Sequence, residues 1–303
     1  MSNILLRETI FEGILVNEAP LRIGAGRADT LGSPIDLPVL RIEYAGSSVP
    51  YIPGSSIKGT FRSCAESLAR ARGLDVCRGL SKMTCMDVKG YPKQEDIKLG
   101  KFVEERLRSG MTEEAVEAIW RGACIICKIF GAPSYSGKVF FSDAYPADIK
   151  EAPRTGIKTG IAIDRRTGAV YGRALFRVEY VEPGAKFKFS IRCRNLPNYA
   201  LGLLSETIHL LNSGFVRIGG FKTRGFGEVR FEDISFKSRD YYGAEEMKKP
   251  LLRSFKQFND EADVEVDLSG VARLDEDGWI ISEDPWKVLD RLREAWNNAA
   301  FKS

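Results

Sequence analysis

Histidine is almost absent from this chain of 303 residues, which contains only His209. A lone histidine in an amphipathic helical pattern is more often a structural residue than a general base, so histidine-based catalysis is disfavoured. No apolar run approaches the roughly 18 residues that a membrane-spanning helix needs, and charge appears too early for a secretory segment. We therefore expect a cytoplasmic protein without a membrane partner, in which the six cysteines are reduced and indicate metal or burial before disulfides.

Net charge is only +4, but its distribution is uneven. Residues 260–303 contain twelve acidic and five basic residues, a net charge of −7, which leaves 40 basic and 29 acidic residues in 1–259, a net charge of +11. A basic body favours a nucleic-acid partner through phosphate neutralisation. The acidic tail could pack on a neighbour, repel bulk polyanion or keep the protein soluble.

Four glycines and two cations are concentrated in the segment Ile218–Val229. Gly219, Gly220, Gly225 and Gly227 allow positive φ and close approach of a ligand, while Lys222 and Arg224 supply positive charge. The spacing matches neither the dinucleotide fingerprint nor a Walker loop. The segment is either a cradle for a polyanion or a glycine-rich hairpin with solvated charges.

Asp36 lies between two prolines in the loop Leu31–Val39. Proline fixes its own φ and restricts the residue before it, so the carboxylate is held on a stiff loop suited to chemistry. The alternative is that Asp36 bonds only to turn backbone, as most loop aspartates do. A nearby turn, Leu21–Arg27, is also rich in glycine and arginine.

A helix is expected after Pro53–Gly54, with Ser55 or Ser56 as its cap. Ile57, Phe61, Cys64 and Leu68 form its buried stripe. Lys58 and Arg62 lie on another face near the positive end of the helix dipole, which predicts a second anion site. Gly59 within this helix indicates close approach by another backbone.

Residues 73–131 lose core periodicity and are predicted to be an insertion with two short helices, near 95–109 and 112–120. This insertion carries Cys77, Cys85 and the C-x2-C pair Cys124 and Cys127. Two such pairs can supply four thiolates to a structural zinc ion, and a metal is most useful where a core is small. The alternative is that these cysteines are small apolar residues.

The remaining pattern predicts an α+β fold of the ferredoxin-like class, with helices on one face of a sheet. Strands are expected at 9–17, 39–44, 138–144, 170–182 and 185–193, with 170–182 and 185–193 joined by Pro183–Gly184 as a pair. Helices are expected at 196–213 and 285–299, and a two-strand supplement within 235–283.

Three segments together resemble the repeat-associated mysterious protein (RAMP) superfamily. They are Gly54–Arg62, Ala162–Thr167 and Gly219–Gly227, and the resemblance covers roughly residues 8–235. The loop Leu31–Val39 is similar to the one that bears the RNA-cleaving aspartate in the backbone subunit of type III CRISPR effector complexes, which act in antiviral defence. The resemblance implies that Asp36 is catalytic. If Asp36 binds a divalent ion, magnesium fits best, because it binds through few carboxylates plus substrate oxygens.

By this resemblance the fold is an RNA-recognition-motif palm with a zinc-binding finger and a thumb hairpin. It implies a RAMP RNA-binding domain at 1–240, with the finger at 73–131 and the thumb at 150–182, and an acidic extension at 241–303. The partners it implies are guide CRISPR RNA, target RNA and other subunits, including copies or paralogues of the chain. The RNA-binding residues that follow are Arg22, Arg27, Lys58, Arg62, Ile163, Arg165, Arg166, Gly219, Gly220, Lys222 and Arg224.

Two other functions stay open from the sequence. The chain could be a non-catalytic RNA-binding scaffold of the same complex, with Asp36 as an ordinary loop residue. It could also be an endoribonuclease that processes guide RNA, for which His209 is a poor general base. Within the cleavage hypothesis, Asp36 acts either as a general base or as a ligand of the divalent ion.

Overall fold

The computed structural model describes residues 4–26, 35–80, 82–88, 97–133, 135–242, 248–258 and 260–301, apart from the side chains of residues 173 and 174. Its centre is one antiparallel sheet in the order β14-β15-β11-β1-β10-β6, with β7 also paired to β10. Its strands are β1 (Arg7–Asn17), β6 (Val139–Phe141), β7 (Tyr145–Pro146), β10 (Lys186–Arg194), β11 (Val229–Asp240), β14 (Ala272–Leu274) and β15 (Ile280–Ser282).

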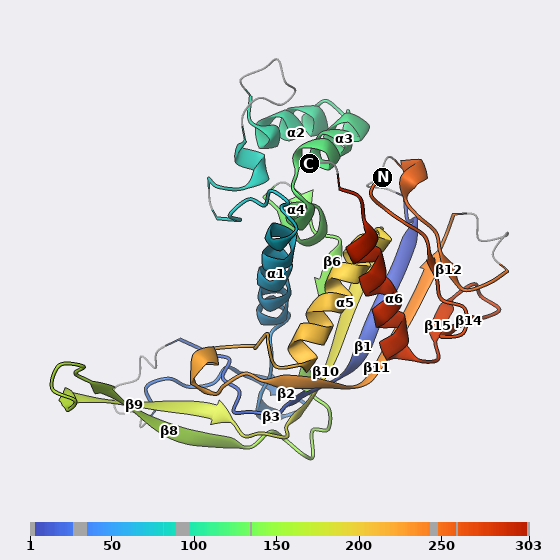
Figure 1. Ribbon diagram of the computed structural model, residues 1–303. Helices are drawn as coiled ribbons and strands as arrows, with labels where there is room; N and C mark the ends of the chain where they lie inside the picture. The colour runs from blue at the N-terminus through green and yellow to red at the C-terminus, as the bar shows by residue number, and fades with distance from the viewer. Residues whose placement is uncertain are drawn as a thin grey trace.

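Two long helices connect the four central strands on one face of the sheet (Figure 1). The chain runs from β1 through α1 (Gly54–Ala71) to β6, then from β10 through α5 (Asn198–Asn212) to β11, which is the ferredoxin-like order. Alternate residues of β10 are buried in the helix-covered core, and the residues between them lie on the other face. The predicted α+β, ferredoxin-like fold is confirmed.

Helix α1 begins differently from the prediction. Neither Ser55 nor Ser56 caps it; the N-cap is Pro53, and the Gly54 amide donates to Oδ1 of Asp143 at 2.7 Å. A side chain at Gly54 would collide with the Phe141 carbonyl, so the cap comes from a neighbouring segment that packs against the backbone. The buried stripe contains Ile57, Phe61 and Cys64 as expected, with Leu68 partly buried.

The insertion after α1 has a small apolar core of its own. This core lies between η1 (Cys85–Asp87), α2 (Leu99–Arg108) and α3 (Thr112–Gly122). The next helix, α4 (Ile125–Phe130), was predicted as part of the insertion, but its isoleucines are buried in the main core beside α1. Its Cys127 lies in the small core of the insertion, so this helix contributes to both cores, and its six residues are too few for helical periodicity to predict it. A short ladder of β4 (Gly131–Ala132) and β5 (Tyr135–Ser136) follows.

A long hairpin projects from the body as an arm (Figure 1). It consists of β8 (Thr155–Ile163) and β9 (Val170–Val181), which pair with each other in a two-stranded sheet outside the main sheet. The predicted pairing of 170–182 with 185–193 is therefore wrong, because β10 pairs with β1 and the chain changes sheets at Pro183–Gly184. Gly156 and Gly160 lie directly under the rings of Tyr180 and Phe176, which leave no room for a side chain.

The segment after residue 240 packs on the body. Its β14 and β15 extend the main sheet, and α6 (Pro285–Asn298) lies along α5 (Figure 1). Two further small ladders outside the main sheet are β2 (Arg41–Tyr44) with β3 (Ser47–Pro50), and β12 (Leu251–Leu252) with β13 (Val266–Asp267). Among the described residues, no helix is both long and apolar enough to cross a membrane.

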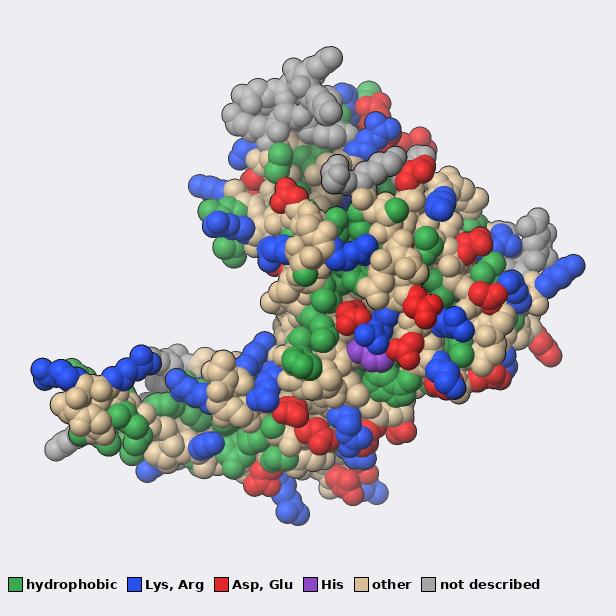
Figure 2. All heavy atoms as spheres, in the orientation of Figure 1, with side chains coloured by type: hydrophobic (Ala, Val, Ile, Leu, Met, Phe, Trp, Pro, Cys, Tyr) green, Lys and Arg blue, Asp and Glu red, His purple; other side chains and the backbone are tan. Residues whose placement is uncertain are grey.

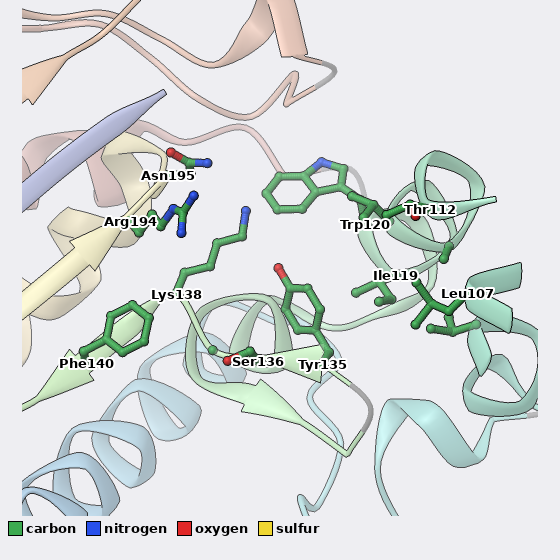
Figure 3. A pocket seen from close by; sticks show the side chains of 14 residues that line it. Leu107, Thr112, Ile119, Trp120, Tyr135, Ser136, Lys138, Phe140, Arg194 and Asn195 are labelled. Carbon is green, nitrogen blue, oxygen red and sulfur yellow. The ribbon is translucent and has the colours of Figure 1, made fainter. Parts of the chain in front are cut away.

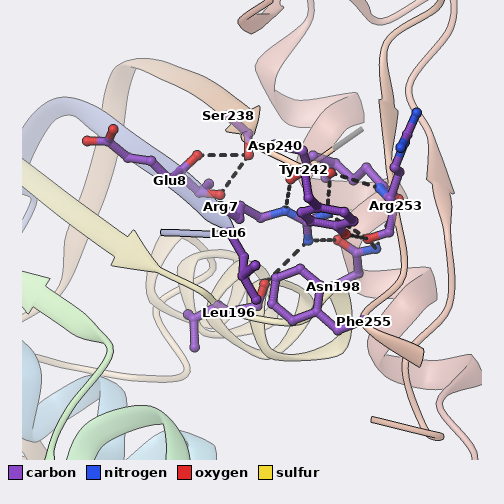
Figure 4. A network of polar contacts seen from close by, with 12 residues as sticks. Leu6, Arg7, Glu8, Leu196, Asn198, Ser238, Asp240, Tyr242, Arg253 and Phe255 are labelled. Atoms are coloured by element: carbon purple, nitrogen blue, oxygen red, sulfur yellow. Dashed lines mark hydrogen bonds and ion pairs between the residues drawn. The ribbon is translucent and has the colours of Figure 1, made fainter. Parts of the chain in front are cut away.

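A buried polar network fixes this segment to the first strand (Figure 4). The guanidinium of Arg7 is fully buried and forms an ion pair with both carboxylate oxygens of Asp240. It also donates to Oδ1 of Asn198 and to the Arg253 carbonyl, each at 2.6 Å, and lies 4.8 Å from the ring centroid of Phe255. One side chain thus ties β1, α5, β11 and the C-terminal segment together.

Candidate nucleic-acid interface and cysteine cluster

A broad hollow opens on one side of the molecule, between the insertion and the hairpin arm (Figure 2). Lys and Arg side chains gather along the arm and on the insertion at the edges of this hollow (Figure 2). The Asp36 loop and the glycine-rich loop both attach near the base of the arm, as the contacts below show.

The backbone around Asp36 adds to the edge of β9 as a short extra strand. The amides of Asp36 and Leu37 donate to the Arg177 carbonyl at 3.2 and 3.1 Å, and the Glu179 amide donates to the Leu37 carbonyl at 3.0 Å. The Arg177 amide in turn donates to Oδ2 of the exposed Asp36 carboxylate at 2.6 Å. Asp36 therefore bonds to backbone, as most loop aspartates do, and the same bond orients its carboxylate at the strand edge. The two alternatives given for Asp36 are thus compatible.

Glu179 on β9 holds the same loop from below. Its side chain is buried and accepts hydrogen bonds from the Val39 amide at 2.9 Å and from Nη2 of Arg41 at 2.6 Å. Burial by itself raises the pKa of Glu179, but the Val39 amide and Arg41 outweigh it and hold the pKa below its ordinary value. Glu179 is thus a charged anchor for the loop that carries Asp36.

The glycine-rich loop packs on the chain segment before Asp36. The amides of Gly220 and Gly227 donate to the carbonyls of Arg22 and Pro20, both at 2.9 Å. Gly219 and Gly227 have φ of +83° and +84°, and a side chain at either would collide with a backbone carbonyl of the protein itself. These glycines therefore serve internal packing, and only the side chains around them are left to contact a polyanion.

Cations and aromatic rings alternate beside this loop. The guanidinium carbons of Arg22 and Arg224 lie 5.5 and 5.4 Å from the ring centroid of Phe221, which lies 5.6 Å from that of Phe226. Nζ of Lys158, on β8, lies 5.5 Å from the Phe226 centroid. We call Arg22, Lys158, Phe221 and Arg224 the basic–aromatic patch. It links the glycine-rich loop to the hairpin strand that pairs with the Asp36-bearing edge.

Arg22 gives the basic–aromatic patch a hydrogen-bond donor that no described residue uses. Its Nε is buried and has no hydrogen-bond partner among the described residues, and burial lowers the pKa of its guanidinium. A buried donor without a partner costs free energy, which an incoming acceptor such as a phosphate oxygen would recover. Lys222 and Arg224 form the exposed turn η2 (Lys222–Arg224) of the glycine-rich loop. Arg27 lies outside the described residues.

The two cations of α1 have different environments. Arg62 donates to Oε1 of Glu66 and to the Gly131 carbonyl, each at 3.2 Å, so it fastens α1 to the end of the insertion. Lys58 is partly buried one helical turn earlier. The close approach expected at Gly59 does not occur within the described residues, and the space beside this exposed glycine is open.

The end of the hairpin arm is fully accessible. Ile163, Arg165 and Arg166, the residues predicted to form a tip that meets RNA, are all exposed. Asp164 shapes the turn, because its Oδ1 accepts the Arg166 amide at 2.8 Å and its amide donates to the Ala169 carbonyl at 2.8 Å. Apolar side chains are also exposed along both strands, and these are Ile157, Ile161, Ile163, Val170, Tyr171 and Leu175.

Four cysteines converge where the insertion meets the body. The sulfur atoms of Cys77, Cys85, Cys124 and Cys127 all lie within 4.8 Å of one another, and those of Cys77 and Cys127 are 3.4 Å apart. Hydrogen bonds from Cys127 and Cys85 lower the pKa of the Cys124 thiol, and the bond to Cys124 raises the pKa of Cys85 to about 12. The cluster could hold a metal ion. Cys64 and Cys193 are buried elsewhere, as predicted.

The remaining candidate residues include one with an expected role and three that the sequence did not indicate. His209 is partly buried against Trp286, with Nε2 3.3 Å from Oδ1 of Asp290, so it has the structural role expected of it. Phe215, beside the glycine-rich loop, is 84% exposed and offers a stacking surface. Glu179 and Lys158 were missed because their roles depend on contacts across the hairpin, which leave no local pattern.

Comparisons with known proteins agree with this architecture. The family model of the RAMP superfamily matches residues 17–230. A protein of Methanocaldococcus jannaschii named CRISPR system Cms endoribonuclease Csm3 is 26% identical over 86% of this chain and 94% of its own length. Proteins of the same name from Methanothermobacter thermautotrophicus and Enterococcus italicus are 24% and 29% identical, over 78% and 70% of this chain and 89% and 83% of their own lengths.

Proposed function

Because the chain belongs to the RAMP superfamily, we propose that it is the guide-RNA-binding backbone subunit of a type III CRISPR complex and cleaves complementary target RNA through Asp36. The endoribonuclease names of three relatives support this reaction class. The observation that carries the proposal is the Asp36 carboxylate itself. It is exposed, oriented by the Arg177 amide and fixed to the strand of an accessible hairpin.

The chemistry needs few side chains, because RNA supplies the nucleophile. The 2′-hydroxyl attacks the adjacent phosphorus, the new P–O bond forms as the bond to the 5′-oxygen breaks, and a 2′,3′-cyclic phosphate results. The proton of the 2′-hydroxyl leaves to a base, and the departing 5′-oxygen gains one. Holding the sugar and phosphate in line already lowers the barrier by orientation. DNA, which lacks the 2′-hydroxyl, would not be cleaved.

Asp36 suits two roles in this reaction. Oδ2 is bonded to the Arg177 amide, whereas Oδ1 has no hydrogen-bond partner among the described residues and faces outward with the exposed carboxylate. It therefore acts as the general base or as the single protein ligand of a magnesium ion. Magnesium fits a site of this kind, because it binds through one or two carboxylates plus substrate oxygens and would stabilise charge on the phosphate.

The guide RNA would lie in the hollow, along the basic–aromatic patch. Arg22 and Arg224, with Lys222 beside them, would contact phosphates, and Lys58 would extend this surface past the open side of Gly59. Arg62 would contribute mainly through α1, since it is already bonded to Glu66 and Gly131. Ile163, Arg165 and Arg166 would wedge into the guide–target duplex, and other subunits of the complex would stack along the same guide.

We assign zinc to the four-cysteine cluster. A tetrahedral ion with bonds of about 2.3 Å separates its sulfur ligands by about 3.8 Å. The sulfur atom of Cys77 lies 3.4 Å from that of Cys127 and 3.9 Å from that of Cys124, and both distances are close to this tetrahedral separation. The zinc would be structural, holding the small core of the insertion against the body.

The test uses the assembled complex with guide, labelled complementary RNA and magnesium. Asp36→Asn preserves an acceptor for the Arg177 amide but removes the charge, and Asp36→Ala removes both. Both variants should abolish cleavage while target binding persists, because the phosphate-binding side chains lie elsewhere. Asp148→Asn is a matched control, since Asp148 is also exposed and also accepts a backbone amide, from Lys150 at 2.8 Å.

Cleavage at regular intervals by Asp36→Ala would refute the catalytic assignment and favour the scaffold function. Cleavage that persists at full rate with chelator present would instead refute the magnesium role. A complex that cuts complementary DNA at the same positions would contradict attack by the 2′-hydroxyl.

A further inference from the structure

A second cavity, distant from Asp36, lies between the insertion and the end of the sheet (Figure 3). Its volume is about 290 Å³, and it is bounded by α3, β5 and the adjoining ends of β6 and β10. The arm joins β10 at Lys186, whereas the cavity lies at Arg194, so about 27 Å of strand separates the two. A ligand in this cavity would not contact the Asp36 site.

Two cations, Lys138 and Arg194, line the cavity, and no carboxylate is among the described residues that line it. Lys138 extends between Trp120 and Tyr135, with Arg194 beside it (Figure 3). Nζ of Lys138 lies 4.9 Å from the centroid of the Trp120 ring, and Nζ of Lys128 lies 5.1 Å from the same ring. Among the described residues, no carboxylate forms an ion pair with Lys138 or Arg194. Burial lowers the pKa of Lys138 to about 8, although the nearby Asp260 carboxylate acts in the opposite direction.

The other wall of the cavity is apolar and of a size suited to a planar group. It consists of α2 and α3 side chains such as Leu107 and Ile119, together with the ring of Tyr135. Burial raises the pKa of Tyr135 to about 12, so its hydroxyl stays protonated and can donate. A ligand that fits must be anionic at one end and apolar or aromatic at the other.

The surface beyond the cavity narrows the choice. Lys188, Arg192 and Arg194 are exposed on the same face of β10, and Phe140, which is 52% exposed, lines the cavity opposite Arg192. This row of cations extends away from the cavity for about 20 Å, beside the Phe140 ring. Glu8 on β1 lies opposite Arg194, and Glu12 accepts a hydrogen bond from the Ser190 hydroxyl within the row. A fatty acid carries a single negative charge and would not contact such a row. A phosphodiester chain carries one negative charge per nucleotide and would contact it along its length.

We propose that this cavity binds a nucleoside monophosphate, either free or as the terminal nucleotide of an RNA strand that lies along β10. The phosphate contacts Lys138 and Arg194, and the base packs between Tyr135 and the apolar wall. Asn195, although at the cavity edge, is not a ligand, because its side chain already bonds to the backbone of Ile4, Leu6 and Arg7.

The experiment measures binding of adenosine monophosphate to the full chain by calorimetry. Lys138→Gln and Arg194→Gln should each weaken binding at least about tenfold, which is about 1.4 kcal/mol. Lys101→Gln is the matched control, because it removes one charge from the exposed side of α2 and should leave binding unchanged. Melting temperatures of all three variants establish that they fold. Photolabelling with 8-azidoadenosine monophosphate should modify peptides that contain Trp120 or Tyr135.

Competition identifies the source of the nucleotide. Displacement by a decamer with a terminal phosphate, but not by the same decamer without it, assigns the site to an RNA end. Failure of both decamers to displace assigns it to the free nucleotide. The proposal is overturned if the Lys138 and Arg194 variants bind like the control, if the label appears elsewhere, or if inorganic phosphate displaces the nucleotide at equal concentration.

Discussion

Replacing Glu179 should release the loop that carries Asp36 without altering any residue that we propose to contact RNA. Glu179→Ala leaves the buried Val39 amide without its acceptor, which costs about 1–3 kcal/mol. It also removes the ion pair with Arg41, which is partly exposed and contributes at most about 1 kcal/mol. A total of about 2 kcal/mol lowers the ratio of docked to undocked loop by about 30-fold.

The measurement is hydrogen exchange at the amides of residues 35–40, together with single-turnover cleavage by the assembled complex. Exchange should accelerate by about the same factor, and cleavage should slow by less, because the backbone bonds to Arg177 still favour docking. Glu179→Gln retains one acceptor, so its exchange and cleavage rates should lie between those of Glu179→Ala and those of the native protein. Glu182→Ala, an exposed glutamate near the end of the same strand, is the control.

The pKa of Glu179 gives the effect a defined pH dependence. Since the folded pKa is lowered from 4.5, the stabilisation is present at neutral pH and is lost as the pH falls through the folded value. The stability difference between the native protein and Glu179→Ala should therefore be constant above about pH 5.5 and shrink in stronger acid. Unchanged exchange in Glu179→Ala at neutral pH would refute the anchoring role.

Three further outcomes follow from the contacts described. Lys222→Ala combined with Arg224→Ala should weaken RNA binding regardless of sequence and reduce the salt-dependence slope by about 1.4, and an unchanged slope would mean that these cations do not contact phosphate. Purified protein should contain about one zinc per chain by metal analysis, and Cys124→Ser should lose it and melt earlier. Asp240→Ala leaves Arg7 buried and unpaired, so urea titration should show a loss of about 3–5 kcal/mol; a loss under 1 kcal/mol would contradict a dry ion pair.

Elements with strong periodicity were predictable from the sequence. Helix α5 has Leu204, Ile208 and Leu211 on its buried side, and β1 and α6 likewise match the predicted positions within two residues. Their burial is decided locally, because each presents one apolar face to a core that any neighbour could complete. The clustering of four cysteines was also predictable, since all four lie in one insertion with a small core and two of them form a C-x2-C pair.

Strand partners and anchoring residues were not predictable in the same way. Pro183–Gly184 has the composition of a hairpin turn, yet the chain there passes from the arm to the main sheet, where the Gly184 amide bonds to the Asn17 carbonyl at 2.7 Å. Glu179 sits in an alternating strand pattern that predicts only one buried face. Its role depends on Val39, which is 140 residues away in the sequence. Such pairings arise from tertiary packing and leave no local signal.

The attachment of Asp36 to β9 fixes the distance between its carboxylate and the tip of the hairpin arm. The carboxylate bonds at Arg177, and the turn of the arm begins beyond Val170, so seven residues of strand, about 23 Å, separate the proposed reactive group from the proposed wedge. Inserting two residues in each strand would lengthen the arm by about 7 Å and leave every side chain on its original face. The length of the arm can thus change without a change at Asp36. Related subunits could therefore contact a duplex at different spacings while they keep the same aspartate.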